Sequence, residues 1–351
     1  MKQPSRRRVG EIQSLWKEYL SGAPRPGALR PAFHARLLRP CSRHLIAKPQ
    51  SPCPRPYTQH PIPYTLRVSV VSLLLAALLR ADARPIGQPW PRQGVVGIGP
   101  ASAAALDLFG PAWYYQYRFD GPDIPGHQRV YLIPPCFDDT ALIRAMHDHP
   151  GAWWLVGNEP NDPAQDNLSP GAYAGFYHRA LMAARRADWS AHIVPAGIAN
   201  ADHTWAAAFR EAYRAQYGRY PPVAAWNIHN YILEPQFSQY DLAEFQRRIV
   251  AFRAWMDAIG EGNKPLLLTE YGALYGSGCC GRPVETPIEG VAFMRAATQW
   301  LQATQYVQAW AWFSLDSSGQ FNGDLLNSSG ALTPFGQTYA EMGDGTRMNA
   351  D

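Results

Sequence analysis

The chain has 351 residues, of which 46% are hydrophobic and 12% aromatic. This length allows one large domain or two small ones, with ample apolar content for a buried core. Residues 1–83 hold 14 Lys and Arg against 3 Asp and Glu, whereas residues 84–351 hold 18 against 25. The body of the chain is mildly acidic and has no dense basic stretch, so we expect no nucleic-acid partner.

The N-terminal part differs in composition from the rest. Residues 1–65 are rich in Arg and Pro and show no sustained apolar period, so we expect a disordered extension. Arg67 then precedes a 12-residue apolar run and the small-x-small site Ala81-Asp82-Ala83. This pattern is typical of a secretory signal peptide, here residues 66–83. The run is shorter than the roughly 20 residues that cross a bilayer, so we expect no stable membrane span.

These features predict a secreted mature chain over residues 84–351, extracellular or periplasmic. A signal peptide usually lies at the extreme N-terminus, and no Met occurs between Met1 and Met146. We therefore expect translation to start at a non-Met codon near Leu66.

Three cysteines remain after removal of the signal peptide. Cys279 and Cys280 could pair with each other, one of them could reach Cys136, or all three could be unpaired. No CxxC or His-x3-His spacing indicates a zinc site, and we expect no cofactor.

From residue 94 onward, short apolar runs alternate with amphipathic stretches. Runs such as Leu266-Leu267-Leu268 are continuous, which is typical of parallel strands covered on both faces. Ser169-Pro170 provides an N-cap and a first-turn proline for one helix. In chain order the pattern predicts strand 94–100, helix 101–109, strands 112–118 and 129–135, helix 139–149, strand 153–158, helix 170–187, strand 192–199, helix 204–217, strand 224–232, helix 242–259, strand 265–271, helix 287–303, strand 307–315 and helix 338–342.

Eight such units in the mature chain match the roughly 250 residues typical of a TIM barrel. A doubly wound sheet is the rival fold, and it usually has a Gly-rich turn after its first strand. Gly97-Ile98-Gly99 lacks the third glycine of GxGxxG. The predicted fold class is therefore α/β, a (β/α)8 TIM barrel.

Two glutamates directly follow apolar runs at the ends of strands. Strand four ends in Asn158-Glu159-Pro160, and strand seven ends in Thr269-Glu270-Tyr271. Catalytic groups of TIM barrels lie at the carboxyl ends of the strands. Each glutamate alone could be a rim carboxylate in a salt bridge. Together they suit glycoside hydrolysis, in which one carboxyl group is protonated and the other is ionised.

Asn158-Glu159-Pro160 on strand four, with Glu270 on strand seven, resembles the signature of glycoside hydrolase clan A over about residues 94–342. Within the clan, the short barrel is similar to family 128 and related small cores, and more loosely to families 5 and 39. The resemblance implies a retaining O-glycosyl hydrolase that cleaves β-glycosidic bonds, with Glu159 as general acid/base and Glu270 as nucleophile.

The same resemblance implies five substrate-binding residues. Asn158 would bind the sugar 2-hydroxyl, His229 would line the sugar subsite, and the Tyr231 hydroxyl would hold the nucleophile. Trp312 would form the floor of the subsite, although core packing is the more frequent use of tryptophan. Arg118 would be the basic residue beside the nucleophile.

Two other classes of protein compete with this interpretation. A non-catalytic glycan-binding barrel would usually lack one glutamate, and both are present. A metal-dependent barrel hydrolase typically has His-x-His at the end of strand one, and residues 94–100 contain no His. We expect a monomer whose partner is an oligo- or polysaccharide. Sugar identity, linkage and endo or exo action depend on the loops after the strands, and the sequence predicts none of them.

Overall fold

The computed structural model describes residues 92–97, 102–110, 112–274, 287–317 and 321–343. The predicted extension (1–65), the predicted signal peptide (66–83), and Cys279 and Cys280 lie outside these residues. Within the described ranges, no helix combines the length and apolar character needed to cross a membrane. Cys136 is disulfide-bonded, so the alternative with three unpaired cysteines is wrong.

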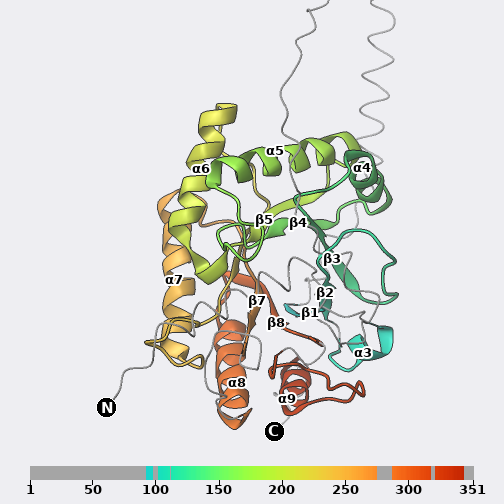
Figure 1. Ribbon diagram of the computed structural model, residues 1–351, viewed down its shortest axis with the longest axis vertical. Coiled ribbons are helices and arrows are strands. Elements are labelled where there is room, and N and C mark those ends of the chain that lie inside the picture. The colour runs from blue at the N-terminus through green and yellow to red at the C-terminus, as the bar shows by residue number, and fades with distance from the viewer. Residues whose placement is uncertain (1–91, 98–101, 111, 275–286, 318–320, 344–351) are drawn as a thin grey trace, which may run out of the picture. The chain divides into compact units, whose positions relative to one another are not determined.

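Eight parallel strands form a barrel at the centre of the described domain, with helices packed around its outside (Figure 1). The strand order is β5-β4-β3-β2-β1-β8-β7-β6. This arrangement confirms the predicted (β/α)8 TIM barrel. The strands are β1 (Gln93–Val96), β2 (Trp113–Tyr115), β3 (Gln128–Ile133), β4 (Trp153–Asn158), β5 (His192–Gly197), β6 (Trp226–His229), β7 (Leu266–Gly272) and β8 (Val307–Phe313).

The barrel closes between β5 and β6 through one residue that follows β5. Ile198 forms a parallel bridge with Ile228. Its N–H donates to the carbonyl oxygen of Asn227 at 3.2 Å, and its own carbonyl accepts from the N–H of His229 at 3.0 Å. This closure brings the ends of β4, β5, β6 and β7 to one rim.

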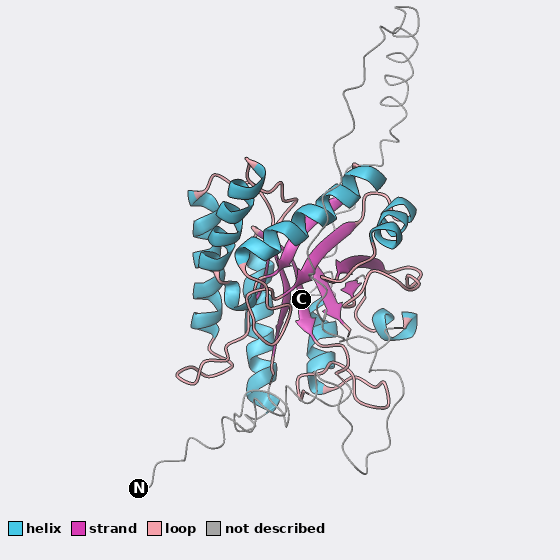
Figure 2. Cartoon of the chain, turned by 45° about the horizontal axis from the view of Figure 1, so that its top comes forward, coloured by secondary structure: helices cyan, strands magenta, loops and turns pink. Residues whose placement is uncertain are grey.

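The helices lie on the outer face of the strands (Figure 2). Local signals explain their positions. For example, Ser169 caps the helix that begins at Pro170, and the buried Tyr173 hydroxyl donates to the carbonyl oxygen of Val156 on β4. The helices are α3 (Ala103–Asp107), α4 (Asp139–Asp148), α5 (Pro170–Ala187), the 3-10 helix η2 (Ala199–Ala201), α6 (His203–Tyr217), α7 (Leu242–Ala258), α8 (Pro287–Ala303) and α9 (Pro334–Gly343).

The connection from β2 to β3 departs from a regular barrel. It contains no helix over residues 116–127, and β2 has three residues where the sequence predicted seven. The buried guanidinium of Arg129 on β3 donates to the carbonyl oxygens of Arg118, Asp120 and Gly121. A side chain thus satisfies backbone acceptors that a helix or a longer strand would otherwise pair.

Candidate active site

Glu159 lies in the turn that follows β4 at the carboxyl end of the barrel. Gly157 has φ +87° and Glu159 has φ +42°, so the chain bends sharply here. The Glu159 N–H donates to the carbonyl oxygen of Gly197 at the end of β5, at 3.1 Å. The side chain is buried, with 8% of the residue surface exposed. A carboxyl group in this position is shielded from solvent and points into the barrel mouth.

Glu270 lies on β7, where the register of the sheet is irregular. The pairing of β7 with β6 and with β8 shifts just before and around Glu270, which lies directly across from His229. Thr269 and Glu270 are adjacent and would point to opposite faces of a regular strand. The irregularity lets both side chains contact the same imidazole.

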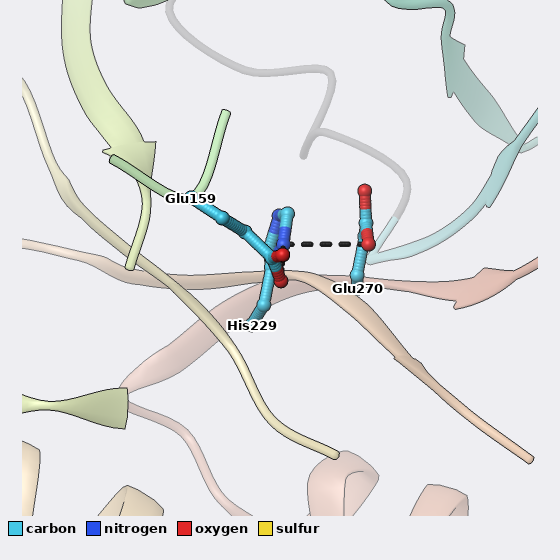
Figure 3. A group of neighbouring side chains, drawn as sticks. All are labelled: Glu159, His229 and Glu270. Carbon is cyan, nitrogen blue, oxygen red and sulfur yellow. Dashed lines mark hydrogen bonds and ion pairs between the residues drawn. The ribbon is translucent and has the colours of Figure 1, made fainter. Parts of the chain in front are cut away.

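His229 lies between the two glutamates (Figure 3). Its Nδ1 is 2.8 Å from Glu159 Oε1 and 3.3 Å from Glu270 Oε2. Its Nε2 is 3.0 Å from the Thr269 hydroxyl. Gly197 packs against the ring, and a Cβ atom there would overlap the imidazole. One buried histidine therefore links the two carboxyl groups on opposite sides of the barrel mouth.

Three phenols hold the carboxylate of Glu270. The hydroxyls of Tyr115 and Tyr117 both donate to Oε1, the second at 2.7 Å. The Tyr231 hydroxyl donates to Oε2 at 2.7 Å. Burial, followed by the charge of Glu270, raises the pKa of all three tyrosines well above the ordinary value. They therefore stay protonated and act as donors.

The carboxyl group of Glu159 has different surroundings from that of Glu270. Burial raises the pKa of its carboxyl group, the hydrogen bond and charge of His229 oppose this rise, and the charge of Glu270 adds to it. Burial lowers the pKa of His229, but the Glu270 charge and the hydrogen bond to Glu159 outweigh burial and raise it. The Glu159–His229 pair therefore holds a proton more tightly than two isolated side chains would.

Of the predicted substrate-binding residues, the structure brings His229 and Tyr231 to the two glutamates. Asn158 lies beside Glu159, with its side-chain Nδ2 donating to Gln165 at 3.2 Å. Arg118 is not beside Glu270, because its half-exposed guanidinium pairs with Asp120 at 2.5 Å. Tyr115 and Tyr117 occupy the place that was expected for a basic residue.

Trp312 also differs from the prediction. Its indole Nε1 donates to the carbonyl oxygen of Gly323 at 2.8 Å, and its ring stacks on Phe335 of α9. It is fully buried between β8 and α9 and forms no floor of the site. The next residue, Phe313, points the other way and packs edge-on against Tyr231 at 6.2 Å between ring centres. Alternation along β8 puts the phenylalanine, not the tryptophan, on the side of the site.

Sequence reasoning missed three residues that contact this site. Tyr115 and Tyr117 alternate along the predicted strand 112–118 and so share one face, a pattern for which packing in the core is the safer interpretation. Thr269 gave no signal, because its contact with His229 depends on the register irregularity of β7.

Among the described residues, Glu159, His229 and Glu270 are the one group whose donor atoms could hold a metal ion, with all ligand atoms within 4.8 Å of one another. The hydrogen bonds to Glu270 compete with metal binding. Three phenols and the imidazole already surround its two oxygens, which together offer about four acceptor positions. The arrangement thus suits proton transfer between the groups better than coordination of a cation.

Comparison with known proteins identifies the family of the chain. A model of the glycosyl hydrolase catalytic core family matches residues 110–339. A search of curated proteins found no match.

Several solved structures share the fold. An endo-β-1,3-glucanase from Pseudomonas viridiflava, of glycoside hydrolase family 128 subgroup II, is 24% identical with a TM-score of 0.55, over 71% of this chain and 96% of that one. A subgroup I endo-β-1,3-glucanase from Amycolatopsis mediterranei in complex with laminaritriose is 20% identical with a TM-score of 0.55, over 72% and 99%. A subgroup III curdlan-specific exo-β-1,3-glucanase from Blastomyces gilchristii is 18% identical with a TM-score of 0.55, over 72% and 99%.

These structures show a shared barrel, and the family model covers most of the described domain, including both glutamates, His229 and the three phenols. The chain belongs to the glycosyl hydrolase catalytic core family and is a glycoside hydrolase.

Proposed function

We propose that this glycoside hydrolase cleaves β-glycosidic bonds of a polysaccharide by double displacement, with Glu159 as general acid/base and Glu270 as nucleophile. One observation carries the proposal: both carboxyl groups approach the same imidazole nitrogen, with their ligand atoms within 4.8 Å of each other. Inverting enzymes need about 6.5–9.5 Å between the carboxyl groups to admit a water molecule. The short separation favours a retaining mechanism.

In the first step, Glu270 attacks the anomeric carbon while Glu159 gives its proton to the departing glycosidic oxygen. The three phenols stabilise Glu270 as an anion and orient its carboxylate. Burial favours the protonated form of Glu159, because it raises the pKa of that carboxyl group. The bond from carbon to the leaving oxygen breaks as the bond from carbon to Glu270 forms.

In the second step, Glu159 removes a proton from water, which attacks the anomeric carbon and releases Glu270. Once Glu270 carries the sugar it has no charge. Its contribution to the raised pKa of Glu159 is then lost, so the pKa of Glu159 falls and the group can act as a base. The charge of one glutamate thereby switches the role of the other between the two steps.

We propose a β-1,3-glucan as the substrate, and Asn158 as the residue that contacts the sugar 2-hydroxyl. The support is the fold shared with β-1,3-glucanases of three subgroups, one of them in complex with laminaritriose. Activity of the full chain would be measured on laminarin, curdlan, cellulose, xylan, mannan and galactan. We expect release of reducing ends from laminarin and curdlan. Hydrolysis of one of the other four polysaccharides, with no hydrolysis of laminarin or curdlan, would refute a β-1,3-glucan as the substrate.

The acid/base role is tested by Glu159→Ala on two substrates that differ in their leaving group. We expect kcat/KM on laminari-oligosaccharides to fall by about 10²–10⁴-fold, and far less on a dinitrophenyl glycoside, whose leaving group needs no proton. Equal losses on the two substrates would reject the acid role.

We also propose that the chain is secreted after cleavage following Ala83. The support is the basic flank, apolar run and small-x-small site of residues 66–83. N-terminal sequencing of the exported protein tests it, and a mature chain that retained residues 1–65 would contradict it.

A further inference from the structure

The backbone of Glu159 is in a conformation that a side chain rarely adopts. Its φ of +42° lies in the left-handed region, which favours glycine. Such a conformation persists where the surrounding contacts fix it. The residues that fix the turn therefore decide where the carboxyl group of Glu159 points.

The turn is attached to a segment that follows the end of β5. Glu159, Pro160, Asn161 and Asp162 form a turn in which the Asp162 N–H donates to the Glu159 carbonyl oxygen at 2.9 Å. At its corner, the Asn161 side chain makes a reciprocal pair with the backbone of Ala199. Nδ2 donates to the Ala199 carbonyl oxygen at 3.1 Å, and Oδ1 accepts from the Ala199 N–H at 2.9 Å. The two bonds together define the orientation of the amide.

Ala199 belongs to a three-residue segment, Gly197 to Ala199, and this segment also holds His229. Gly197 leaves room for the imidazole and accepts the N–H of Glu159, while the Ile198 carbonyl accepts the N–H of His229. Segment 197–199 is thus bonded to the turn that carries Glu159 on one side and to His229 on the other. The distance of 2.8 Å between Glu159 and His229 depends on this shared attachment.

We propose that Asn161 is a positioning residue for Glu159, which it holds against His229 by clamping the turn after β4 onto segment 197–199. The inference rests on the proposed acid/base role of Glu159. Among the residues that the structure describes, the Asn161 side chain bonds to Ala199 and not to the three phenols that hold Glu270, which lie on β2, just after β2 and just after β6. Loss of the clamp therefore affects the steps that use the acid/base and leaves nucleophilic attack intact.

The test compares two leaving groups in Asn161→Ala and Asn161→Asp, made in the full chain. For laminari-oligosaccharides we expect kcat/KM to fall by about 10- to 100-fold, as a displacement near 1 Å of a catalytic group does. For a dinitrophenyl laminari-oligosaccharide, which needs no acid, we expect kcat/KM within about threefold of wild type. Azide, which needs no base, should accelerate turnover of the aryl substrate by the variants and not by the wild type.

Asn327→Ala is the matched control. The Asn327 side chain also holds a rim loop through backbone bonds, accepting from the N–H groups of Ser329 and Ala331, but contacts neither glutamate. We expect the wild-type ratio of the two kcat/KM values for this variant. Thermal unfolding of each variant verifies the fold. If Asn161→Ala does not fold, Asn161→Asp carries the comparison, because it keeps the size and the acceptor and loses the donor.

Equal losses on both substrates, or wild-type values on both, would overturn the role of Asn161. Glu159→Ala on the same substrates separates this failure from failure of the proposed function. A selective loss in Glu159→Ala with a uniform loss in the Asn161 variants rejects the clamp alone. A uniform loss in Glu159→Ala rejects the acid role and the clamp with it.

Discussion

Glu270 and Glu159 lie on either side of one imidazole, yet their surroundings differ in kind. Glu270 receives hydroxyl donors from three tyrosines, of which Tyr115 lies on β2, Tyr117 just after β2 and Tyr231 just after β6. Within the described part of the chain, the side chain of Glu159 is hydrogen-bonded to His229 only, and burial favours its protonated form. The fold thus gives two identical side chains different hydrogen-bond partners.

The two glutamates also differ in how they are held. Glu270 lies within a strand, so its position follows from the sheet and from the irregular register of β7. Glu159 lies in a turn with a left-handed backbone, and its position depends on side-chain contacts of that turn. We therefore expect substitutions around Glu270 to change how well its negative charge is stabilised. Substitutions around Glu159 should change the position of its carboxyl group and the affinity of that group for a proton.

The largest effect should come from removing the phenols on the Glu270 side. Each hydroxyl bonded to a charged group contributes about 1.5–3 kcal/mol. We expect Tyr115→Phe, Tyr117→Phe and Tyr231→Phe each to lower kcat/KM by about tenfold or more, and equally on good and poor leaving groups. Tyr213→Phe is the control, because that buried hydroxyl pairs with His178 in the helix layer. A loss confined to poor leaving groups would show that the phenols act on Glu159 instead.

A smaller effect should follow from His229→Gln on the Glu159 side. The hydrogen bond and charge of His229 lower the pKa of Glu159, against the rise caused by burial. Glutamine removes the charge, so Glu159 should keep its proton to higher pH. We expect the upper limb of the profile of kcat/KM against pH to move to higher pH. A shift to lower pH would mean that His229 supports the protonated acid rather than opposing it.

The smallest effect concerns stability. Burial raises the pKa of Asp166 to about 6, against the hydrogen bond from the Asn158 N–H and with a further rise from the charge of Glu159. A carboxyl group whose pKa is raised by folding destabilises the folded state above pH 6. This penalty disappears as the pH falls from about 6 toward the unfolded value of 3.8.

Asp166→Asn keeps an acceptor for Asn158 and removes the charge. We expect its free energy of unfolding to exceed that of the wild type by about 3 kcal/mol at pH 8 and to match it near pH 4. Urea unfolding at the two pH values measures this difference. A variant less stable than the wild type at pH 8 would show that the carboxylate is the better partner for the turn.

Local signals in the sequence predicted much of the fold. The bounds of β4, α5 and α8 agree with the predicted ranges, because Ser169-Pro170 and the apolar runs are effects of near neighbours. The β2–β3 connection was predicted less well. Its shape depends on Arg129, whose bonds to the loop follow from the packed barrel.

For the site, the sequence predicted both glutamates, His229 and Tyr231, because each lies at or just beyond the carboxyl end of a strand. Thr269 was not predictable, since a contact beside Glu270 requires the irregular pairing with β6 and β8. Trp312 was placed in the site from the resemblance to glycoside hydrolase clan A. Its direction depends on alternation along β8, which puts Phe313 beside Tyr231 instead.

The central claim is that the Glu270 carboxylate forms the covalent intermediate and Glu159 does not. A dinitrophenyl laminari-oligosaccharide fluorinated beside the anomeric carbon would be incubated with the full chain, and the proteolytic peptides would be examined by mass spectrometry. Fluorine slows both steps, whereas the good leaving group keeps the first step faster than the second, so the intermediate accumulates. We predict one sugar adduct on the peptide that contains Glu270. An adduct on Glu159, or inactivation without an adduct on either glutamate, would contradict the assignment.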